Sequence, residues 1–243
     1  MSGHSKWHNI QGRKGKQDAL RSAMFSKYSK LITIAAKGGG DPDKNFSLRI
    51  AIDKAKSVSM PKDNIDKAIK KGTGELNDGI VLEEALYEAF GPGGVAVLIK
   101  AVTDNKNRTV SEIKHILTKS GGSMAGPGSV AWMFEQLGVI RLTAEELKNK
   151  NISQDDFEMS LIEVGAQDIK VEEDEIEVLT KIEDLQKVLG KIKEMNIEPN
   201  KSGIEWVAKE KVEIPEENVD KLQNLFGELE EREDVEDYFT NAK

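Results

Sequence analysis

Residues 3–37 read GHSKWHNIQGRKGKQDALRSAMFSKYSKLITIAAK and contain eight lysines and arginines against a single acidic residue. Residues 1–74 as a whole carry 16 lysines and arginines against 6 acidic residues, whereas the rest of the 243-residue chain carries 19 against 37. The formal net charge of −8 therefore combines a positive part and a negative part. This division indicates a basic module that meets a polyanion, joined to an acidic body.

The beginning of this stretch, residues 2–15, has little apolar periodicity and three glycines, which is typical of an extended arm. It presents one aromatic ring among cations. The cations can replace the counterions of nucleic-acid phosphates, and the flat ring can stack on a base. The alternative is a disordered tail in which Trp7 packs against a nearby helix. The residues of the arm predicted to bind nucleic acid are Lys6, Trp7, His8, Arg13, Lys14 and Lys16.

The second half of the stretch predicts a helix over residues 17–37, ended by the glycines at 38–40. Its apolar side repeats at spacings of three and four residues. That side consists of Leu20, Met24, Tyr28, Leu31 and Ala35. Lys27, Lys30 and Lys37 fall on the opposite side, and we add Lys27, Lys30 and Arg21 to the predicted nucleic-acid-binding residues.

Two more helices are expected before the composition changes, over residues 45–58 and 61–72. Pro61 is a favourable first helical residue, and Gly72 ends the pattern. With the preceding helix they predict a small all-α, three-helix domain with basic outer faces, spanning residues 1–78.

After a linker at residues 73–80, the apolar pattern changes to that of strands. Residues 81–90 and 95–102 predict two strands around a Gly-Pro-Gly-Gly turn, the second apolar enough to be covered on both faces. The spacing of Thr109 and Glu112 matches a capping box, so we expect a helix to begin there. Residues 129–134 predict a further strand.

The rest of the chain repeats similar elements and closes with a strand, a helix and a strand over residues 204–214, 216–230 and 235–240. The closing elements supply what the earlier unit lacks, which predicts that the chain leaves a middle domain and later returns to it. We therefore predict an α+β fold. Its domains are a basic helical domain at 1–78, a discontinuous α/β domain at 79–135 plus 205–243, and an inserted α/β domain at 136–204.

Four segments resemble the YebC/PmpR family, whose eukaryotic relative is the mitochondrial translational activator of cytochrome c oxidase. They are GHSKWHNIQGRK at 3–14, MPKDNIDKAIKKGTGE at 60–75, YEAFGPGGVAVLIKAVTDNKNRTVSEIKHILTKSGG at 87–122 and GSVAWMF at 128–134. The resemblance implies a helical first domain and two ferredoxin-like α/β domains, the middle one discontinuous. It also implies a cytoplasmic regulator of gene expression, described either as a DNA-binding transcriptional regulator or as a translation factor that contacts the ribosome and eases synthesis through proline runs.

Other chemistry finds little support in the residues. His4 and His8 have a possible ligand spacing, but no cysteine is present and no nearby carboxylate completes a zinc set. The glycine clusters lack the spacing of a nucleotide-binding loop. We expect no metal, no cofactor and no small-molecule substrate.

The polar loop at residues 103–108 is open to two interpretations: a contact surface in which Arg108 binds nucleic acid, or a loop that leads into a helix cap. The acidic residues after 143 resemble solvated helix faces, and no spacing singles out a general acid and base. We therefore expect that the protein is not an enzyme.

Three functions remain open at this point. The first, which we favour, is an RNA-binding translation factor that contacts rRNA or tRNA, possible partners including the ribosome. The second is a DNA-binding transcriptional regulator, although the basic residues are spread over several helices rather than gathered on one recognition helix. The third is a scaffold whose acidic domains bind a basic protein. The polar N-terminus and the lack of a long apolar run predict a cytoplasmic protein without a membrane span.

Overall fold

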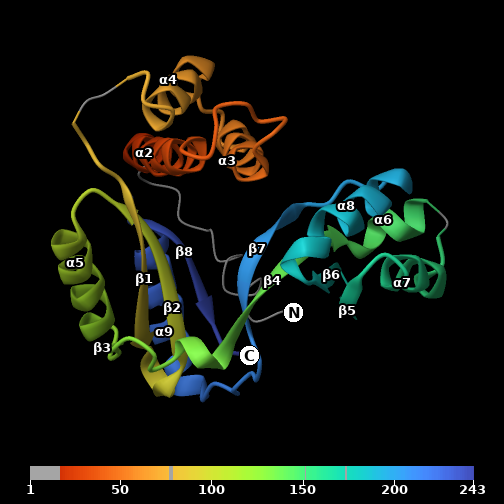
Figure 1. Cartoon of the computed structure of the whole chain (residues 1–243). Coiled ribbons are helices and arrows are strands. Elements are labelled where there is room, and N and C mark those ends of the chain that lie inside the picture. The colour runs from red at the N-terminus through yellow and green to blue at the C-terminus, as the bar shows by residue number, and fades with distance from the viewer. Residues whose placement is uncertain (1–16, 77–78, 151, 173) are drawn as a thin grey trace.

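The computed structural model describes residues 17–76, 79–150, 152–172 and 174–243, without the side chains of residues 17–20 and of Lys148. In these residues a group of helices is followed by two four-stranded antiparallel sheets, each covered by helices on one face (Figure 1). This confirms the predicted α+β class, with helices first and two ferredoxin-like units after them.

The helical unit contains α2 (Gln17–Ala36), α3 (Phe46–Ser57) and α4 (Lys62–Gly72), close to the three expected ranges. Asn45 caps α3, because its side chain accepts a hydrogen bond of 3.0 Å from the backbone N–H of Leu48. Gly72 allows α4 to approach α2, since a Cβ there would lie 2.3 Å from the carbonyl oxygen of Thr33. The buried side chains of the unit include Leu31, Ile32, Ala36, Leu48, Ala51, Ile52, Ala55, Met60, Ile65 and Ala68.

Sheet A has the strand order β3-β1-β2-β8. Its strands are β1 (Glu83–Phe90), β2 (Ala96–Thr103), β3 (Ser123–Ala125) and β8 (Val235–Thr240). Helices α5 (Lys106–Lys119) and α9 (Glu216–Glu230) cover the face to which Val97 and Ile99 of β2 point. Leu98 of the same strand is buried on the other face, against Phe134 and Phe239. The central strand is therefore covered on both sides, as its apolar sequence predicts.

Sheet B has the order β5-β6-β4-β7. Its strands are β4 (Phe134–Thr143), β5 (Ala166–Val171), β6 (Glu175–Thr180) and β7 (Lys201–Ala208). Helices α6 (Ala144–Asn149), α7 (Gln154–Ile162) and α8 (Leu185–Glu194) pack on one face. The opposite face carries two buried ion pairs, of Arg141 with Glu177 and with Glu205, each at 2.8 Å.

Sheet A takes strands from both sides of sheet B in the chain, which is the arrangement expected of a discontinuous middle domain. The chain passes from sheet A to β4 of sheet B through the short turn η2 (Ala131–Met133), and it returns to sheet A through α9 and β8. The exact domain boundaries remain a prediction. Strand pairing nevertheless puts all of β7, including residues 205–208, in sheet B, because Ala208 still pairs with Phe134.

Helix α2 lies between the other two helices and sheet A, where it contacts β2 and β8 as well as α3 and α4 (Figure 1). The expected basic outer face is therefore wrong for the side of α2 that carries Lys27 and Lys30. That side faces the body of the protein. A periodic sequence shows which residues share a side of a helix, but it does not show what packs against that side.

Two local predictions are also corrected. Helix α5 begins at Lys106 rather than Thr109, because Asn105 is the residue whose side chain accepts a hydrogen bond, of 3.1 Å, from the backbone N–H of Arg108. Of the strand expected at residues 129–134, only Phe134 lies in a strand and residues 131–133 form the turn η2, since a buried carboxylate, Glu88, accepts hydrogen bonds from the backbone N–H groups of Val130 and Ala131.

Candidate nucleic-acid interface

Six of the predicted contact residues, those of the basic arm, lie outside the residues that the structure describes. They are Lys6, Trp7, His8, Arg13, Lys14 and Lys16. The four others are described, on α2 and at the start of α5. Arg21 on α2 is exposed, and Lys27, Lys30 and Arg108 take part in contacts with the body of the protein.

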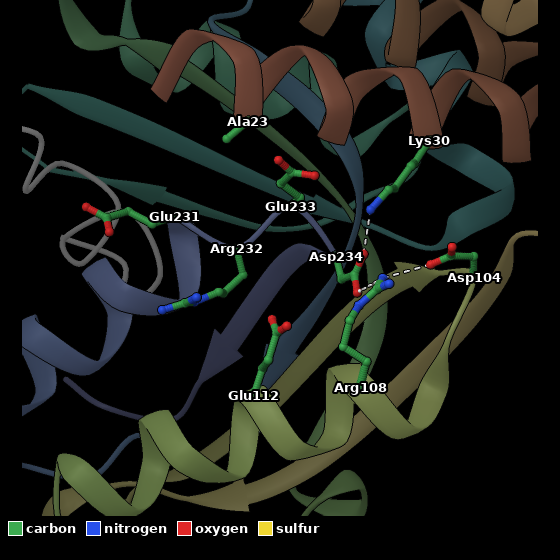
Figure 2. Close-up of a pocket in the computed structure, with 9 residues that line it drawn as sticks. All are labelled: Ala23, Lys30, Asp104, Arg108, Glu112, Glu231, Arg232, Glu233 and Asp234. Carbon is green, nitrogen blue, oxygen red and sulfur yellow. Dashed lines mark hydrogen bonds and ion pairs between the residues drawn. The ribbon is translucent and has the colours of Figure 1, made fainter. Parts of the chain in front are cut away.

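Lys30 and Arg108 meet at the same carboxylate, although they are far apart in the sequence. The amine of Lys30 lies 2.5 Å from Oδ1 of Asp234, and one terminal nitrogen of Arg108 lies 2.8 Å from its Oδ2 (Figure 2). Asp234 is in the connection between α9 and β8, and its side chain is 6% exposed. This carboxylate therefore joins the helical unit to α5 and sheet A through two cations. We call Lys30, Arg108, Asp234 and their hydrogen-bonding neighbours the Asp234 cluster.

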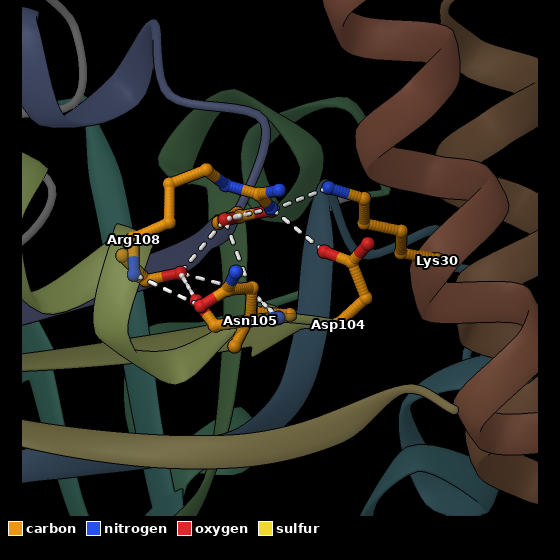
Figure 3. A network of polar contacts seen from close by, with 7 residues as sticks. Lys30, Asp104, Asn105 and Arg108 are labelled. Carbon is orange, nitrogen blue, oxygen red and sulfur yellow. Dashed lines mark hydrogen bonds and ion pairs between the residues drawn. The ribbon is translucent and has the colours of Figure 1, made fainter. Parts of the chain in front are cut away.

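Two threonines complete the cluster from the middle domain. Thr109 on α5 donates to Oδ2 of Asp234 at 2.7 Å, and Thr103 at the end of β2 donates at 3.1 Å. Thr103 also accepts the backbone N–H of Asn105 at 2.9 Å, which fixes the turn between β2 and α5. Figure 3 shows Asn105 beneath the guanidinium of Arg108, where it caps the helix.

Electrostatics favour the ionised form of Asp234. Burial alone raises the pKa of this carboxyl, but hydrogen bonds from Arg108, Lys30 and Thr109 outweigh burial and lower the pKa to about 2. Hydrogen bonds to Asp234 and Asp104 raise the pKa of Arg108 above its ordinary value. Asp234 is therefore ionised at neutral pH, with Arg108 and Lys30 bonded to it and Asp104 as a second, exposed carboxylate on Arg108.

The two cations differ in how much surface they keep. The side chain of Lys30 is 19% exposed and that of Arg108 is 44% exposed. Arg108 also bonds Asp104 at 2.7 Å, so one of its terminal nitrogens is shared between two carboxylates. Arg108 can still present part of its guanidinium to a ligand, whereas Lys30 mainly holds α2 against the body.

Lys27 lies one turn before Lys30 on α2 and also faces the body. Burial lowers its pKa, although the nearby carboxylates of Asp237, Glu230 and Glu236 act in the opposite direction. Lys27 is therefore half-buried against the body and adds little to an outer basic surface.

A cavity of about 500 Å³ opens beside the Asp234 cluster, between α2, α5 and the end of α9 (Figure 2). Its charged lining is acidic in balance, so it is poorly suited to a phosphate. The lining residues are Ala23, Lys30, Asp104, Arg108, Glu112, Glu231, Arg232, Glu233 and Asp234. The lining contains no serine, histidine or other pair that would serve as nucleophile and base. Among the described residues, no group of three or more His, Cys, Asp or Glu side chains is placed to hold a metal ion.

Exposed positive charge remains on the helical unit away from this cavity. Helix α4 exposes three lysines, and α2 exposes Arg21 near its start. The lysines of α4 are Lys62, Lys67 and Lys70. Together with the arm, whose eleven-residue core at 6–16 holds four lysines and arginines, these residues are the candidate surface for a polyanion.

The sequence gives little sign of Asp234, Thr103 and Thr109 as a group. Asp234 occurs in an acidic run, Glu-Glu-Arg-Glu-Asp, which is typical of a solvated surface. The capping-box spacing identifies Thr109 only as a possible helix cap. The one available signal is the polar loop at 103–108 beside a very apolar strand, which indicates the correct place but not Asp234, 126 residues after Arg108.

Comparison with known proteins agrees with this fold. A family profile described as "TACO1/YebC second and third domain" matches residues 82–242, and one described as "TACO1/YebC protein N-terminal domain" matches residues 5–75. The chain therefore belongs to the TACO1/YebC family, as its motifs predict.

Similar proteins match over nearly their whole length. A protein of Maridesulfovibrio salexigens named "Probable transcriptional regulatory protein" is 49% identical over 242 residues, covering 100% of this chain and 95% of the relative. One of Thermoanaerobacter pseudethanolicus with the same kind of name is 43% identical, covering 100% and 97%. The crystal structure of a conserved hypothetical protein from Aquifex aeolicus has a TM-score of 0.82 at 39% identity and covers 98% of this chain and 96% of its own.

Within the described part of the chain, no helix is both long and apolar enough to cross a membrane.

Proposed function

We propose that this protein is a non-enzymatic, nucleic-acid-binding regulator of gene expression that works in the cytoplasm. The observation that carries the proposal is the division of charge between a basic N-terminal part and an acidic body. The phosphates of a nucleic acid attract the basic N-terminal part, and the acidic body limits unspecific adhesion of the whole molecule. The names of the similar proteins support a role in regulation.

The contact surface that we propose consists of the basic arm, Arg21 and the exposed lysines of α4, with Arg108 as an additional contact at the edge of the Asp234 cluster. Lys27 and Lys30, which the sequence places in the same group, have a different role in this proposal. Because both face the body, they set the position of the basic domain relative to the sheets.

We favour RNA, and contact with the ribosome, as the target. The reason is that α2 turns two of its lysines inward, and the exposed cations are distributed over an arm and separate helices. Such a distribution suits tracking of an irregular phosphate surface better than insertion of one recognition helix into a major groove. DNA remains the second candidate, and the names of the similar proteins as transcriptional regulators favour it.

The test compares two double variants with the same change in net charge. Lys14→Glu with Arg21→Glu alters the basic part, and Lys187→Glu with Lys221→Glu alters exposed lysines of the acidic body. We expect only the first to lose cosedimentation with ribosomes and to lower the slope of log affinity against log salt by about one for each lost phosphate contact.

Binding of promoter, scrambled duplex and ribosomal RNA is then measured with the same proteins over a range of salt. Tighter binding to the promoter than to the scrambled duplex, without ribosome association, would replace RNA by DNA as the target. Equal loss of binding in both double variants would contradict the proposal that the basic part, and not the acidic body, binds the nucleic acid.

A further inference from the structure

Trp132 is a large aromatic side chain that the middle domain exposes instead of burying. Its side chain lies in the turn η2 and the residue is 64% exposed. The residues two positions before and after it are inside: Val130 is fully buried and Phe134 nearly so, both against Leu98 and Phe239 of sheet A. A segment that buries these residues while exposing a tryptophan between them leaves unusual apolar area in water.

The turn that holds Trp132 is fixed by a buried carboxylate. Glu88 of β1 accepts the backbone N–H groups of Gly128, Val130 and Ala131, at 2.6, 2.6 and 2.9 Å. Charge-assisted hydrogen bonds of this kind are among the stronger ones in proteins. The backbone that precedes Trp132 is therefore anchored to the centre of sheet A.

The indole itself is also positioned. Its Nε1–H donates to the carbonyl oxygen of Ser129 at 3.0 Å, so the polar edge of the ring is bonded within the turn. On the other side, the backbone N–H of Lys209 donates to Met133, and its amine donates to the carbonyl oxygen of Trp132 at 2.9 Å. The hydrogen bond of its Nε1–H therefore holds the ring, and the charged amine of Lys209 is bonded to the backbone of the same residue. The rest of the ring surface is open to a flat ligand.

We infer that Trp132 is a stacking site for an unpaired base of the bound RNA, with Lys209 beside it to contact the adjoining phosphate. This inference rests on the proposed nucleic-acid function and places a second contact in the middle domain, apart from the basic arm. Base stacking on an aromatic ring requires an exposed, preordered face and tolerates any base. A fixed exposed tryptophan next to a lysine meets that requirement, and the bonded Nε1–H leaves the face as the available surface.

The surroundings determine how this contact should behave. The exposed Glu135 lies three residues after Trp132, and the exposed Glu210 directly follows Lys209, so the site has little net positive charge. Stacking rather than phosphate attraction must supply most of its contribution. Loss of Trp132 should therefore weaken binding at every salt concentration without changing the salt slope, unlike loss of arm lysines.

The experiment uses the full chain with Trp7→Phe and Trp206→Phe, which leaves Trp132 as the single tryptophan. The probe is an oligouridylate of about 12 nucleotides, within the usual site size for single strands. We expect quenching of the Trp132 fluorescence by this probe and none by an abasic strand of the same length. Quenching equal for both strands, or absent for both while the protein binds them, would overturn the inference.

Affinity of the otherwise unaltered protein is measured in parallel. We expect Trp132→Leu to bind the oligouridylate about fivefold or more weakly, Trp132→Phe to recover most of the loss, and Met159→Ala, at a residue 62% exposed on α7, to bind normally. Equal affinity of Trp132→Leu and the unaltered protein would mean that the exposed ring serves something other than RNA, such as a protein partner. Failure of the unaltered protein to bind any RNA would instead contradict the proposed function itself.

Discussion

Replacing Asp234 with asparagine would remove the charge at the centre of the Asp234 cluster while keeping the size of the side chain. Burial alone raises the pKa of Asp234, but bonds from Arg108, Lys30 and Thr109 lower it from 3.8 to about 2. A lowering of this size corresponds to about 2 kcal/mol of folding free energy at neutral pH. We expect Asp234→Asn to reduce the free energy of unfolding by about this amount.

The effect of pH on this variant follows from the direction of the shift. The pKa of Asp234 is lower in the folded protein than in the unfolded chain, so the unfolded chain binds the proton first as the pH falls. The stabilisation is therefore complete above about pH 5 and is lost between about pH 5 and about pH 2. We expect the difference in stability between the unaltered protein and Asp234→Asn to shrink over that range.

Equilibrium unfolding in urea, followed by circular dichroism at several pH values, measures both effects. The matched control is Asp104→Asn, which removes the other carboxylate on Arg108. Asp104 is 39% exposed, and an exposed pair of this kind contributes less than about 1 kcal/mol. The reasoning would be refuted by equal losses in the two variants, or by a loss in Asp234→Asn that stays constant down to about pH 2.

Two further predictions concern the packing of the sheets and helices. Arg141→Leu removes the common partner of Glu177 and Glu205, which are each 6% exposed. It should lower the free energy of unfolding in urea by about 3 kcal/mol or more. A variant with all three residues changed to leucine that is as unstable as Arg141→Leu would contradict this account. Gly72→Ala places a Cβ 2.3 Å from a backbone oxygen of α2 and should cost about 1 to 3 kcal/mol in the same assay, whereas Gly203→Ala meets no atom within 4 Å and should stay close to the unaltered protein.

Much of the local structure could be predicted from the sequence, because it depends on neighbours in the chain. The helices at 17–36, 46–57 and 62–72 end at glycines or begin at capping residues that are visible in the residue pattern. The apolar run of β2 predicts a strand covered on both faces. The division of charge is a property of composition alone, and each family motif is a short contiguous segment of the sequence.

The strand expected at residues 129–134 shows where such prediction ends. Its apolar residues fit a strand, but the side chain of Glu88, some 40 residues earlier, binds the backbone of this segment and bends it into a turn. The exposure of Trp132 follows from that turn. A side chain that competes for backbone N–H groups from another element cannot be recognised from the segment itself.

The sequence by itself determined the helices, the buried central strand, the family and the opposite charges of the two parts. Only the tertiary structure decided which cations face solvent: Lys30 meets a carboxylate 204 residues later, and Arg108 meets the same carboxylate 126 residues later. The physical reason is that a side chain's charge is set by its own chemistry, whereas its partner is set by whichever distant segment the fold brings within hydrogen-bond distance.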